Sequence, residues 1–260
     1  MKKVALITGA SSGIGRELAR IHAQAGGDLV LVARSADKLA LLRDEFSLHF
    51  GTEVLVIPID LTEPDAPQRV FDQVLAHGIK LTYLINNAGF GGIGLFYKRK
   101  WQDDRDMIQL NVVALSAMCR LFIPVFVKQH KGRILNVSSM ASLMPGPLQA
   151  VYYATKAYVT SFSNALSEEL EGTGVTVTTL LPGAVKTQFG QISGMDKTAL
   201  FKHPADPNRV AFDGYMGMLK GDLNVITGLN VVQKMSFPLS RLIPQRTLMK
   251  MVRKMQQVEG

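Results

Sequence analysis

The stretch VALITGASSGIGRELARIHAQA, residues 4–25, places a glycine-rich segment between a short apolar run and a helical pattern. The run at 4–8 has the apolar, β-branched character of a buried strand, whereas apolar residues recur at helical spacing across 16–25. The sequence therefore predicts a strand that passes through a short loop directly into a helix.

Three glycines occupy the loop between this strand and this helix. Gly9 permits a sharp turn out of the strand, Gly13 lets the backbone approach a pyrophosphate, and Gly15 lets the helix pack closely on the sheet. The helix N-terminus also offers free backbone amides to negative charge. A plain strand-to-helix turn is the alternative, but three glycines at this place favour a loop that binds a dinucleotide.

Apolar runs of the same kind occur at six later places, which are 28–33, 53–59, 81–86, 133–138, 175–181 and 224–227. Longer segments with helical patterns separate them, and this alternation predicts a parallel sheet with helices on both faces. Runs that are apolar at nearly every residue fit such a sheet, because both of its faces are buried. We therefore expect one α/β domain over residues 1–260, a Rossmann-type fold with a doubly wound, seven-stranded parallel sheet.

The composition is that of a folded globular protein, with 47% hydrophobic and 19% charged residues. The single cysteine, Cys119, excludes an internal disulfide and favours a reducing, cytoplasmic location. The five histidines show no ligand-like spacing, so we expect no metal site. The net charge of +8 is scattered along most of the chain, and no apolar run reaches about 18 residues, so we expect neither a nucleic-acid partner nor a transmembrane span.

Further motifs stand at the ends of the predicted strands. Asp60 and Leu61 follow the third strand, NNAG at 86–89 ends the fourth, and PGAVKT at 182–187 ends the sixth. With the glycine loop, these motifs resemble the short-chain dehydrogenase/reductase superfamily from residue 4 to about 190. Within it the chain resembles a bacterial branch labelled only as short-chain oxidoreductase. The resemblance implies an oxidoreductase that uses a nicotinamide dinucleotide.

The resemblance also implies which residues bind the cofactor. The aspartate after the third strand holds the adenine, and the turn after the sixth closes over the nicotinamide. The full set is Gly9, Ser11, Ser12, Gly13, Ile14, Gly15, Arg34, Asp60, Leu61, Asn87, Ala88, Gly89, Tyr152, Lys156, Pro182, Gly183, Val185 and Thr187.

The segment VYYATKAYV at 151–159 holds three tyrosines and one lysine. A carbonyl that accepts hydride develops negative charge on oxygen and needs a proton donor. Tyr152 shares a helix face with Lys156, Tyr158 points elsewhere, and Tyr153 is not excluded by spacing alone. A cation about 4 Å away at an effective dielectric of about 20 supplies on the order of 4 kcal/mol. That is enough to bring a tyrosine pKa from about 10 to about 7 or 8.

The family pattern Y-x-x-x-K selects Tyr152 as the proton donor, with Lys156 lowering its pKa and holding the nicotinamide ribose. By the same resemblance Ser139 positions the carbonyl oxygen, whereas Ser138 is a structural residue at the strand end. Asn111 matches the asparagine that supports a water-linked proton path behind the lysine. Its alternative role is that of a polar residue bonded to backbone within a helix.

The end of the second strand indicates the choice of cofactor. Enzymes that use NAD usually carry an acidic residue there, whereas enzymes that use NADP offer arginine to the 2′-phosphate. Here Ala33 takes the acidic position and Arg34 follows it, which predicts NADP(H) over NAD. Ser12 replaces the family's second basic residue, so the preference is expected to be moderate.

The segments after the strand ends carry apolar residues that favour an apolar ketone or a 3-oxoacyl substrate. They are Phe90, Leu95, Phe96, Leu143, Met144, Leu148 and Phe189, although loop packing alone also explains them. Residues 188–210 show no clear period and are expected to form a mobile substrate loop.

The segment 231–258 is basic, with Leu248, Met251, Met255 and Val258 at helical spacing. We expect it to pack on the domain or on another subunit, with contact to an anionic membrane surface as the alternative. The resemblance also implies a homodimer or homotetramer.

Two alternatives to a reductase remain. A protein that senses NADP(H) without catalysis usually loses the tyrosine or the lysine, and both are present here. Sugar-nucleotide epimerases share Y-x-x-x-K but usually have a longer C-terminal domain.

Overall fold

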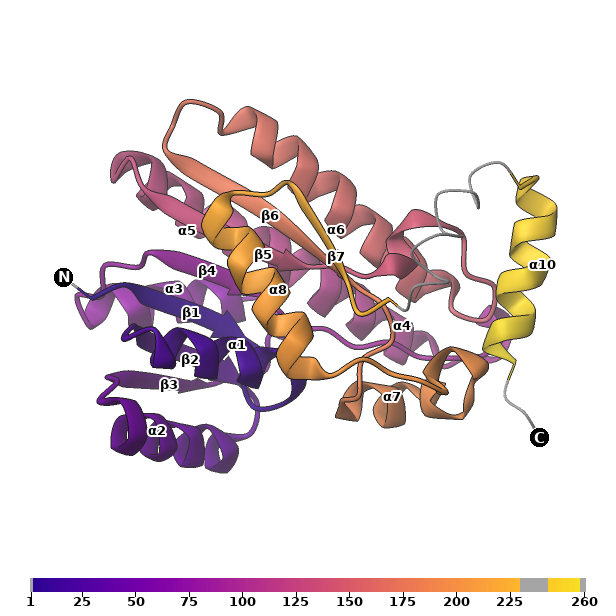
Figure 1. Cartoon of the computed structure of the whole chain (residues 1–260), viewed down its shortest axis with the longest axis horizontal. Helices are drawn as coiled ribbons and strands as arrows, with labels where there is room; N and C mark the ends of the chain where they lie inside the picture. Colours follow the sequence, from indigo (N-terminus) through magenta and orange to yellow (C-terminus); the bar gives the residue numbers. More distant parts are fainter. Residues whose placement is uncertain (1, 230–242, 258–260) are drawn as a thin grey trace.

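The computed structural model describes residues 2–229 and 243–257 of the chain. Within them, seven parallel strands form one sheet in the order β3-β2-β1-β4-β5-β6-β7 (Figure 1). The strands are β1 (Val4–Thr8), β2 (Asp28–Ala33), β3 (Val54–Pro58), β4 (Tyr83–Asn86), β5 (Gly132–Val137), β6 (Val175–Pro182) and β7 (Asn224–Thr227). Every strand lies within two residues of its predicted bounds, so the doubly wound, seven-stranded parallel sheet is confirmed.

The strand order places a topological switch between β1 and β4. β1 pairs with β2 on one side and with β4 on the other. The chain builds the sheet outward from β1 to β3 and then, in the opposite direction, from β4 to β7. Ligands of open α/β sheets bind beyond the carboxyl ends of the strands at such a point. The loops after β1 and β4 are therefore the first place to look for a site.

Two layers of helices enclose the sheet. The helices are α1 (Gly13–Gln24), α2 (Ala36–Phe50), α3 (Ala66–Ala76), α4 (Trp101–Ile108), α5 (Leu115–Lys128), α6 (Ala150–Glu169), α7 (Gln188–Ser193), α8 (Pro207–Lys220) and α10 (Gln245–Gln256). α1, α2 and α8 cover one face, and α1 and α8 lie in front of the sheet in Figure 1. α3, α5 and α6 cover the other face. Neighbouring residues of β1 serve both layers, because Leu6 packs in one and Ile7 in the other.

α4 and α5 are continuous through a π-helical segment, η2 (Gln109–Ala114). The resulting helix, Trp101–Lys128, is long and apolar enough to cross a membrane by length and composition alone, which departs from the expectation that no such segment exists. Pro124 lies inside this helix and does not end it. Phe122 and Phe126 are fully buried in the apolar layer on the sheet, as in a core helix of a globular domain.

The segment 188–210 is not a long loop. It forms α7, two 3-10 turns called η4 (Met195–Lys197) and η5 (Ala199–Phe201), and the start of α8. Thr187 caps α7 by accepting a hydrogen bond from the amide of Phe189, and Gly194 ends it at a φ of 72°. Elements this short leave no periodic pattern, which is why the sequence does not reveal them. That the segment moves stays a prediction.

α10 confirms a helix in the C-terminal segment but turns a different face inward from the one predicted. Val252 and Gln256 are buried, whereas Met251 and Met255 are 49% and 40% exposed. Val258 and residues 231–242 lie outside the described residues. The helix packs on the domain, which was one of the two placements expected.

Candidate active site

The loop after β1 is a cradle that only glycine permits. Gly9 and Gly13 have φ angles of 65° and 54°. A Cβ added to Gly15 would lie 2.3 Å from the carbonyl oxygen of Gly9. α1 begins at Gly13 after an extended Ser12, with no side-chain cap and no acidic residue in its first turn. The free amides and the positive helix end therefore suit the phosphates of a dinucleotide.

The segment after β4 is held against this loop by hydrogen bonds. Thr8 Oγ1 accepts from the amides of Asn87 and Ala88, both at 3.0 Å. Asn87 Nδ2 donates to the carbonyls of Thr8 at 2.9 Å and Gly9 at 3.2 Å. These bonds fix the two loops on either side of the topological switch, so the motifs that the sequence places apart form one surface.

The turn after β6 closes the same surface from the other side. The amide of Gly183, which follows Pro182, donates to the carbonyl of Thr227 at 2.9 Å, and Val185 bridges to Ala205. A Cβ on Gly13 would lie 2.9 Å from Cγ2 of Thr187, which shows how closely the turn approaches the glycine loop.

A groove of about 660 Å³ runs beside the glycine loop, between α1, α2 and the start of α7. Ser11, Ser12, Gly13 and Thr187 line it, as do Lys38 and Lys186, which the sequence analysis missed. Lys38 follows Arg34 by four residues, at the start of α2. Its place in the first turn of the helix after β2, close in sequence to Arg34, was the available signal.

The predicted adenine and 2′-phosphate residues lie together at the ends of β2 and β3. The side chain of Arg34 is 76% exposed, and its guanidinium lies 3.9 Å from Asp60 Oδ2. Asp60 Oδ1 accepts from the amide and the hydroxyl of Thr62, at 2.9 and 2.8 Å. Leu61 is buried and Ile14 is half-buried against the core. An exposed arginine with one long, weak ion pair remains available to a phosphate.

α6 brings Tyr152 and Lys156 to the end of β5, where Ser139 follows the strand. The side chains of Ser139 and Tyr152 share a hydrogen bond. Lys156 Nζ lies 5.9 Å from the centroid of the Tyr152 ring and donates to the carbonyl of Val137 at 2.9 Å. Gly89, at the end of the NNAG motif, leaves the space beside this amino group open, because a Cβ there would lie 3.4 Å from Nζ.

The other two tyrosines of the segment point away from this site. Tyr153 Oη accepts a hydrogen bond from Gln256 Nε2 at 2.6 Å. Tyr158 is exposed, shares a hydrogen bond with Ser116 and stacks on Phe162. Of the two tyrosines that spacing left open, Tyr152 is therefore the one that lies beside Ser139 and Lys156.

Ser138 and Asn111 hold backbone around the site. Ser138 Oγ donates to the carbonyl of Lys156 at 2.9 Å, a structural role as expected. Asn111, in the π-helical segment, accepts from the amide of Phe90 at 3.1 Å and donates to its carbonyl at 2.9 Å. It also donates to Thr155 Oγ1 at 3.1 Å. Asn111 thus anchors the loop after β4, and its part in a proton path stays a prediction.

Burial dominates the electrostatics of the tyrosine and the lysine. It raises the pKa of Tyr152 to about 12, and the hydrogen bond with Ser139 opposes this rise. Burial also lowers the pKa of Lys156 to about 8. The lowered tyrosine pKa expected from the sequence is not found in this arrangement. The lysine amino group lies toward the ring and is hydrogen-bonded to backbone, and the apolar surroundings disfavour both charges.

An apolar cluster covers Tyr152. Phe90, Met144 and Phe189, three of the predicted lining residues, belong to it together with Met195 and Val252. Phe96 does not, because it is exposed and borders a different pocket. Leu95, Leu143 and Leu148 are likewise outside the cluster.

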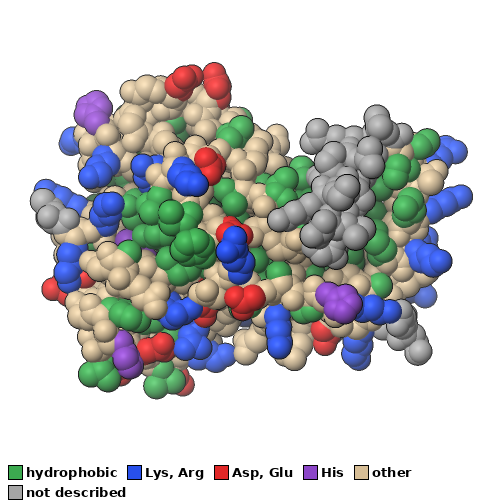
Figure 2. Space-filling model, viewed as in Figure 1, with side chains coloured by type: hydrophobic (Ala, Val, Ile, Leu, Met, Phe, Trp, Pro, Cys, Tyr) green, Lys and Arg blue, Asp and Glu red, His purple; other side chains and the backbone are tan. Residues whose placement is uncertain are grey.

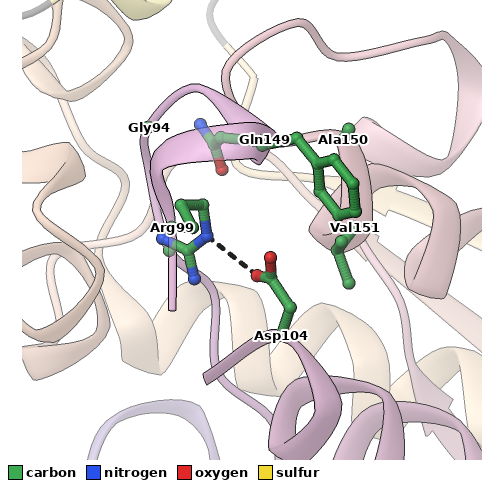
Figure 3. A pocket seen from close by; sticks show the side chains of 8 residues that line it. Gly94, Arg99, Asp104, Gln149, Ala150 and Val151 are labelled. Carbon is green, nitrogen blue, oxygen red and sulfur yellow. Dashed lines mark hydrogen bonds and ion pairs between the residues drawn. The ribbon is translucent and has the colours of Figure 1, made fainter. Parts of the chain in front are cut away.

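That second pocket lies between the loop after β4 and the start of α6 (Figure 3). Arg99 donates to Asp104 Oδ1 at 2.8 Å, and Gln149 faces the pair. The space measures about 10 Å³, which is room for about one water. The buried ion pair fixes the loop that forms one side of the Tyr152 site.

Comparisons with known proteins agree with this geometry. The family model described as short chain dehydrogenase matches residues 3–197. A very-long-chain 3-oxoacyl-CoA reductase from Bos taurus is 36% identical over 197 residues, covering 72% of this chain and 61% of the relative. An uncharacterized oxidoreductase from Myxococcus xanthus is 32% identical over 94% of this chain and 90% of its own. The chain spans only 61% to 65% of the length of the first curated relatives that it matches.

Solved structures extend the similarity to nearly the whole chain. A short-chain dehydrogenase from Sphingobium yanoikuyae in complex with NADPH is 30% identical, covers 99% of both chains and has a TM-score of 0.83. A 7beta-hydroxysteroid dehydrogenase is 25% identical over 96% of both chains, with a TM-score of 0.85. A bulky-bulky ketone specific alcohol dehydrogenase from Comamonas testosteroni is 28% identical, covers 99% of this chain and 96% of its own, and has a TM-score of 0.79. The chain therefore belongs to the short-chain dehydrogenase family.

Proposed function

We propose that this protein reduces a carbonyl group with NADPH, and that its substrate is an apolar ketone or a 3-oxoacyl compound. The observation that carries the proposal is the meeting of Tyr152, Ser139 and Lys156 beside the glycine cradle. NADPH, when bound, would supply hydride to the carbonyl carbon. Ser139 and Tyr152, which share a hydrogen bond, orient the carbonyl oxygen between them.

Tyr152 then gives its hydroxyl proton to the oxygen as negative charge develops there. Lys156 is close enough to the ring to stabilise the phenolate that remains. Asn111 keeps the loop after β4 in place through both of its bonds to Phe90. The apolar cover over Tyr152 excludes water from the reacting groups.

Two features of this chain support NADPH over NADH. Ala33 leaves the end of β2 without an acidic side chain, and the exposed Arg34 follows it directly. Lys38 lines the groove beside the glycine loop. The Sphingobium relative was solved with NADPH. We expect Arg34→Ala to raise the KM for NADPH more than the KM for NADH, with Arg69→Ala on α3 as a matched control. A wild-type enzyme that prefers NADH would contradict this choice.

The substrate class rests on the apolar residues around Tyr152 and on the relatives. Curated relatives at 32–36% identity are named as 3-oxoacyl-CoA reductases, and structural relatives as enzymes for hydroxysteroids and for bulky ketones. These names share a carbonyl or alcohol on a large apolar body, which suits a cluster built from Phe90, Met144 and Phe189.

We also propose that the protein is a homo-oligomer in the cytoplasm. Figure 2 shows hydrophobic side chains gathered over α8 and the edge strand β7, where Phe212, Leu223 and Ile226 are exposed. An apolar sheet edge favours pairing with a second copy. We therefore expect a homodimer or homotetramer. The only cysteine, Cys119, is buried and free, as suits a reducing compartment.

The test is NADPH oxidation, followed at its near-ultraviolet absorbance band, against ketones, aldehydes and 3-oxoacyl thioesters. Tyr152→Phe should abolish turnover while NADPH still binds, and Tyr158→Phe, which removes an exposed hydroxyl from the same helix, is the matched control that keeps the chemistry. If the wild-type protein binds NADPH and reduces nothing, a cofactor-sensing protein becomes the better hypothesis.

A further inference from the structure

α10 packs over the residues that surround Tyr152, at the end of the molecule beyond α4 and α7 (Figure 1). Leu248, Val252 and Gln256 recur every four residues and form the inward face of the helix. Val252 is buried in the same apolar cluster as Tyr152, and Leu248 packs against that cluster. The helix therefore belongs to the apolar cluster that contains Tyr152.

Tyr152 is closed in on several sides. The ring of Phe189 lies 5.6 Å from its own, centroid to centroid. A Cβ added to Gly91 would lie 3.1 Å from the Tyr152 ring and 3.0 Å from Phe189, so the backbone after β4 closes another side. A substrate oxygen must come within about 2.6–3.2 Å of the hydroxyl. An apolar substrate body must therefore take the place of part of this cluster.

Among the segments that form this cluster, α10 lies farthest along the chain from the strand that precedes it. Phe90, Met144 and Phe189 lie just beyond the ends of β4, β5 and β6, whereas Val252 lies on a helix that follows the last strand. One hydrogen bond between described residues ties the inward face of this helix down, from Gln256 Nε2 to Tyr153 Oη. Gln256 Oε1 is buried and has no partner among the described residues. A half-satisfied buried amide makes this closed packing less favourable.

We infer that α10 forms the substrate-contacting wall of the catalytic pocket, with Val252 as a specificity-determining residue and Gln256 as the positioning residue that holds the wall through Tyr153. This inference rests on the proposed reductase function and narrows it. The substrate is a carbonyl compound whose large apolar body lies between Tyr152 and α10.

The wall sets a size preference. A small ketone leaves the contacts of Val252 and Leu248 unchanged and gains nothing from them. A longer chain replaces those contacts and buries its own methylene groups, each of which is worth about fourfold in kcat/KM. The enzyme therefore selects for apolar length up to the point where the chain passes beyond α10.

The experiment measures kcat/KM for a series of methyl ketones with about 4 to about 12 carbons, expecting about fourfold per methylene in the wild type. Val252→Phe enlarges the side chain on the inward face of the helix and should end the rise at shorter chains, and Val252→Ala should extend it. NADPH affinity should not change in either variant. Lys254→Ala, on the exposed face of α10, should keep the wild-type profile.

The hydrogen bond is tested separately. Tyr153→Phe and Gln256→Leu should each raise kcat/KM for long ketones through KM, with kcat little changed. The double variant should match either single variant, because both act through one bond. A merely structural role would instead lower stability and activity alike for every chain length.

The outcomes separate this inference from the function on which it rests. If Val252→Phe and Val252→Ala both give profiles parallel to the wild type, α10 is not the substrate wall and the inference is wrong, although the reductase stands. If the wild type binds NADPH and reduces no ketone, the proposed function itself fails. Should Val252→Phe not fold, Val252→Ala alone still decides between the two profiles.

Discussion

Replacing Lys156 with methionine should stabilise the fold while it abolishes turnover. Burial lowers the pKa of this amino group from 10.5 to about 8. At about 1.36 kcal/mol per pKa unit, folding therefore disfavours the charged lysine by about 3 kcal/mol at neutral pH. Methionine keeps the length and removes the charge. Loss of the hydrogen bond to Val137 opposes this by about 1 kcal/mol, which leaves a net gain of about 2 kcal/mol in the free energy of unfolding.

The pH dependence distinguishes this effect from a simple gain in packing. Between the folded pKa of about 8 and the unfolded value of 10.5, the unfolded chain carries the proton and the folded chain does not. The free-energy cost of burying this lysine is therefore full below about pH 8 and falls as pH rises toward 10.5. Stability of the wild type rises with pH across that window for this reason. The advantage of Lys156→Met should shrink by about 1 kcal/mol between about pH 7 and pH 9. Tyrosines titrate in the unfolded chain only near pH 10, so the buried tyrosines do not produce this change between pH 7 and pH 9.

Urea unfolding followed by circular dichroism, at both pH values, measures the two free energies. Lys128→Met removes an exposed lysine at the end of α5 and is the matched control, expected to stay within about 0.5 kcal/mol of the wild type. A Lys156→Met protein that is less stable than the wild type at neutral pH would refute the reasoning. So would a gain that does not change with pH, because desolvation of the charge would then not be its source.

Three further predictions concern the loops and the edge of the sheet. Asp104→Ala removes the carboxylate that lies 2.8 Å from Arg99 and should lower the free energy of unfolding in urea by about 3–5 kcal/mol. Asp106→Ala breaks a more exposed ion pair, 3.9 Å from Arg105, and should lower it by less than about 1 kcal/mol. Gly15→Ala places a Cβ 2.3 Å from the Gly9 carbonyl, so NADPH affinity by titration calorimetry should fall at least about tenfold, or about 1.4 kcal/mol. Ile226→Asp puts a charge on the exposed edge of β7 and should shift the mass by light scattering toward the monomer.

The sheet was predictable because a strand buried on both faces needs apolar residues at nearly every position. That requirement leaves a signal in each strand, and the same holds for the glycine loop, where a Cβ on Gly15 would collide with backbone. Local patterns of this kind predict where each strand ends, and the residues of the site follow the strand ends. Tyr152, Ser139 and Lys156 therefore meet where the sequence places them.

The face of α10 and the protonation of Tyr152 could not be predicted in the same way. Met251 and Met255 make the better apolar stripe, yet the helix buries Gln256, because that residue bonds to Tyr153 at a distance of 103 positions along the chain. The spacing of residues predicted the positive charge of Lys156 near Tyr152. It did not predict the burial of Tyr152, which has the larger effect on the pKa of that tyrosine. Both depend on which segments cover the site, and no local period encodes that.

The burial of Tyr152 also bears on its role as the proton donor of the proposed reaction. A proton donor must be protonated before the hydride arrives, and a pKa of about 12 keeps this tyrosine protonated at neutral pH. An apolar cover that includes Phe189 and Val252 disfavours the phenolate. A substrate that displaces this cover brings a carbonyl oxygen to the hydroxyl in place of apolar side chains. The closed arrangement therefore keeps Tyr152 in its acid form, which the proposed proton transfer to a carbonyl oxygen requires.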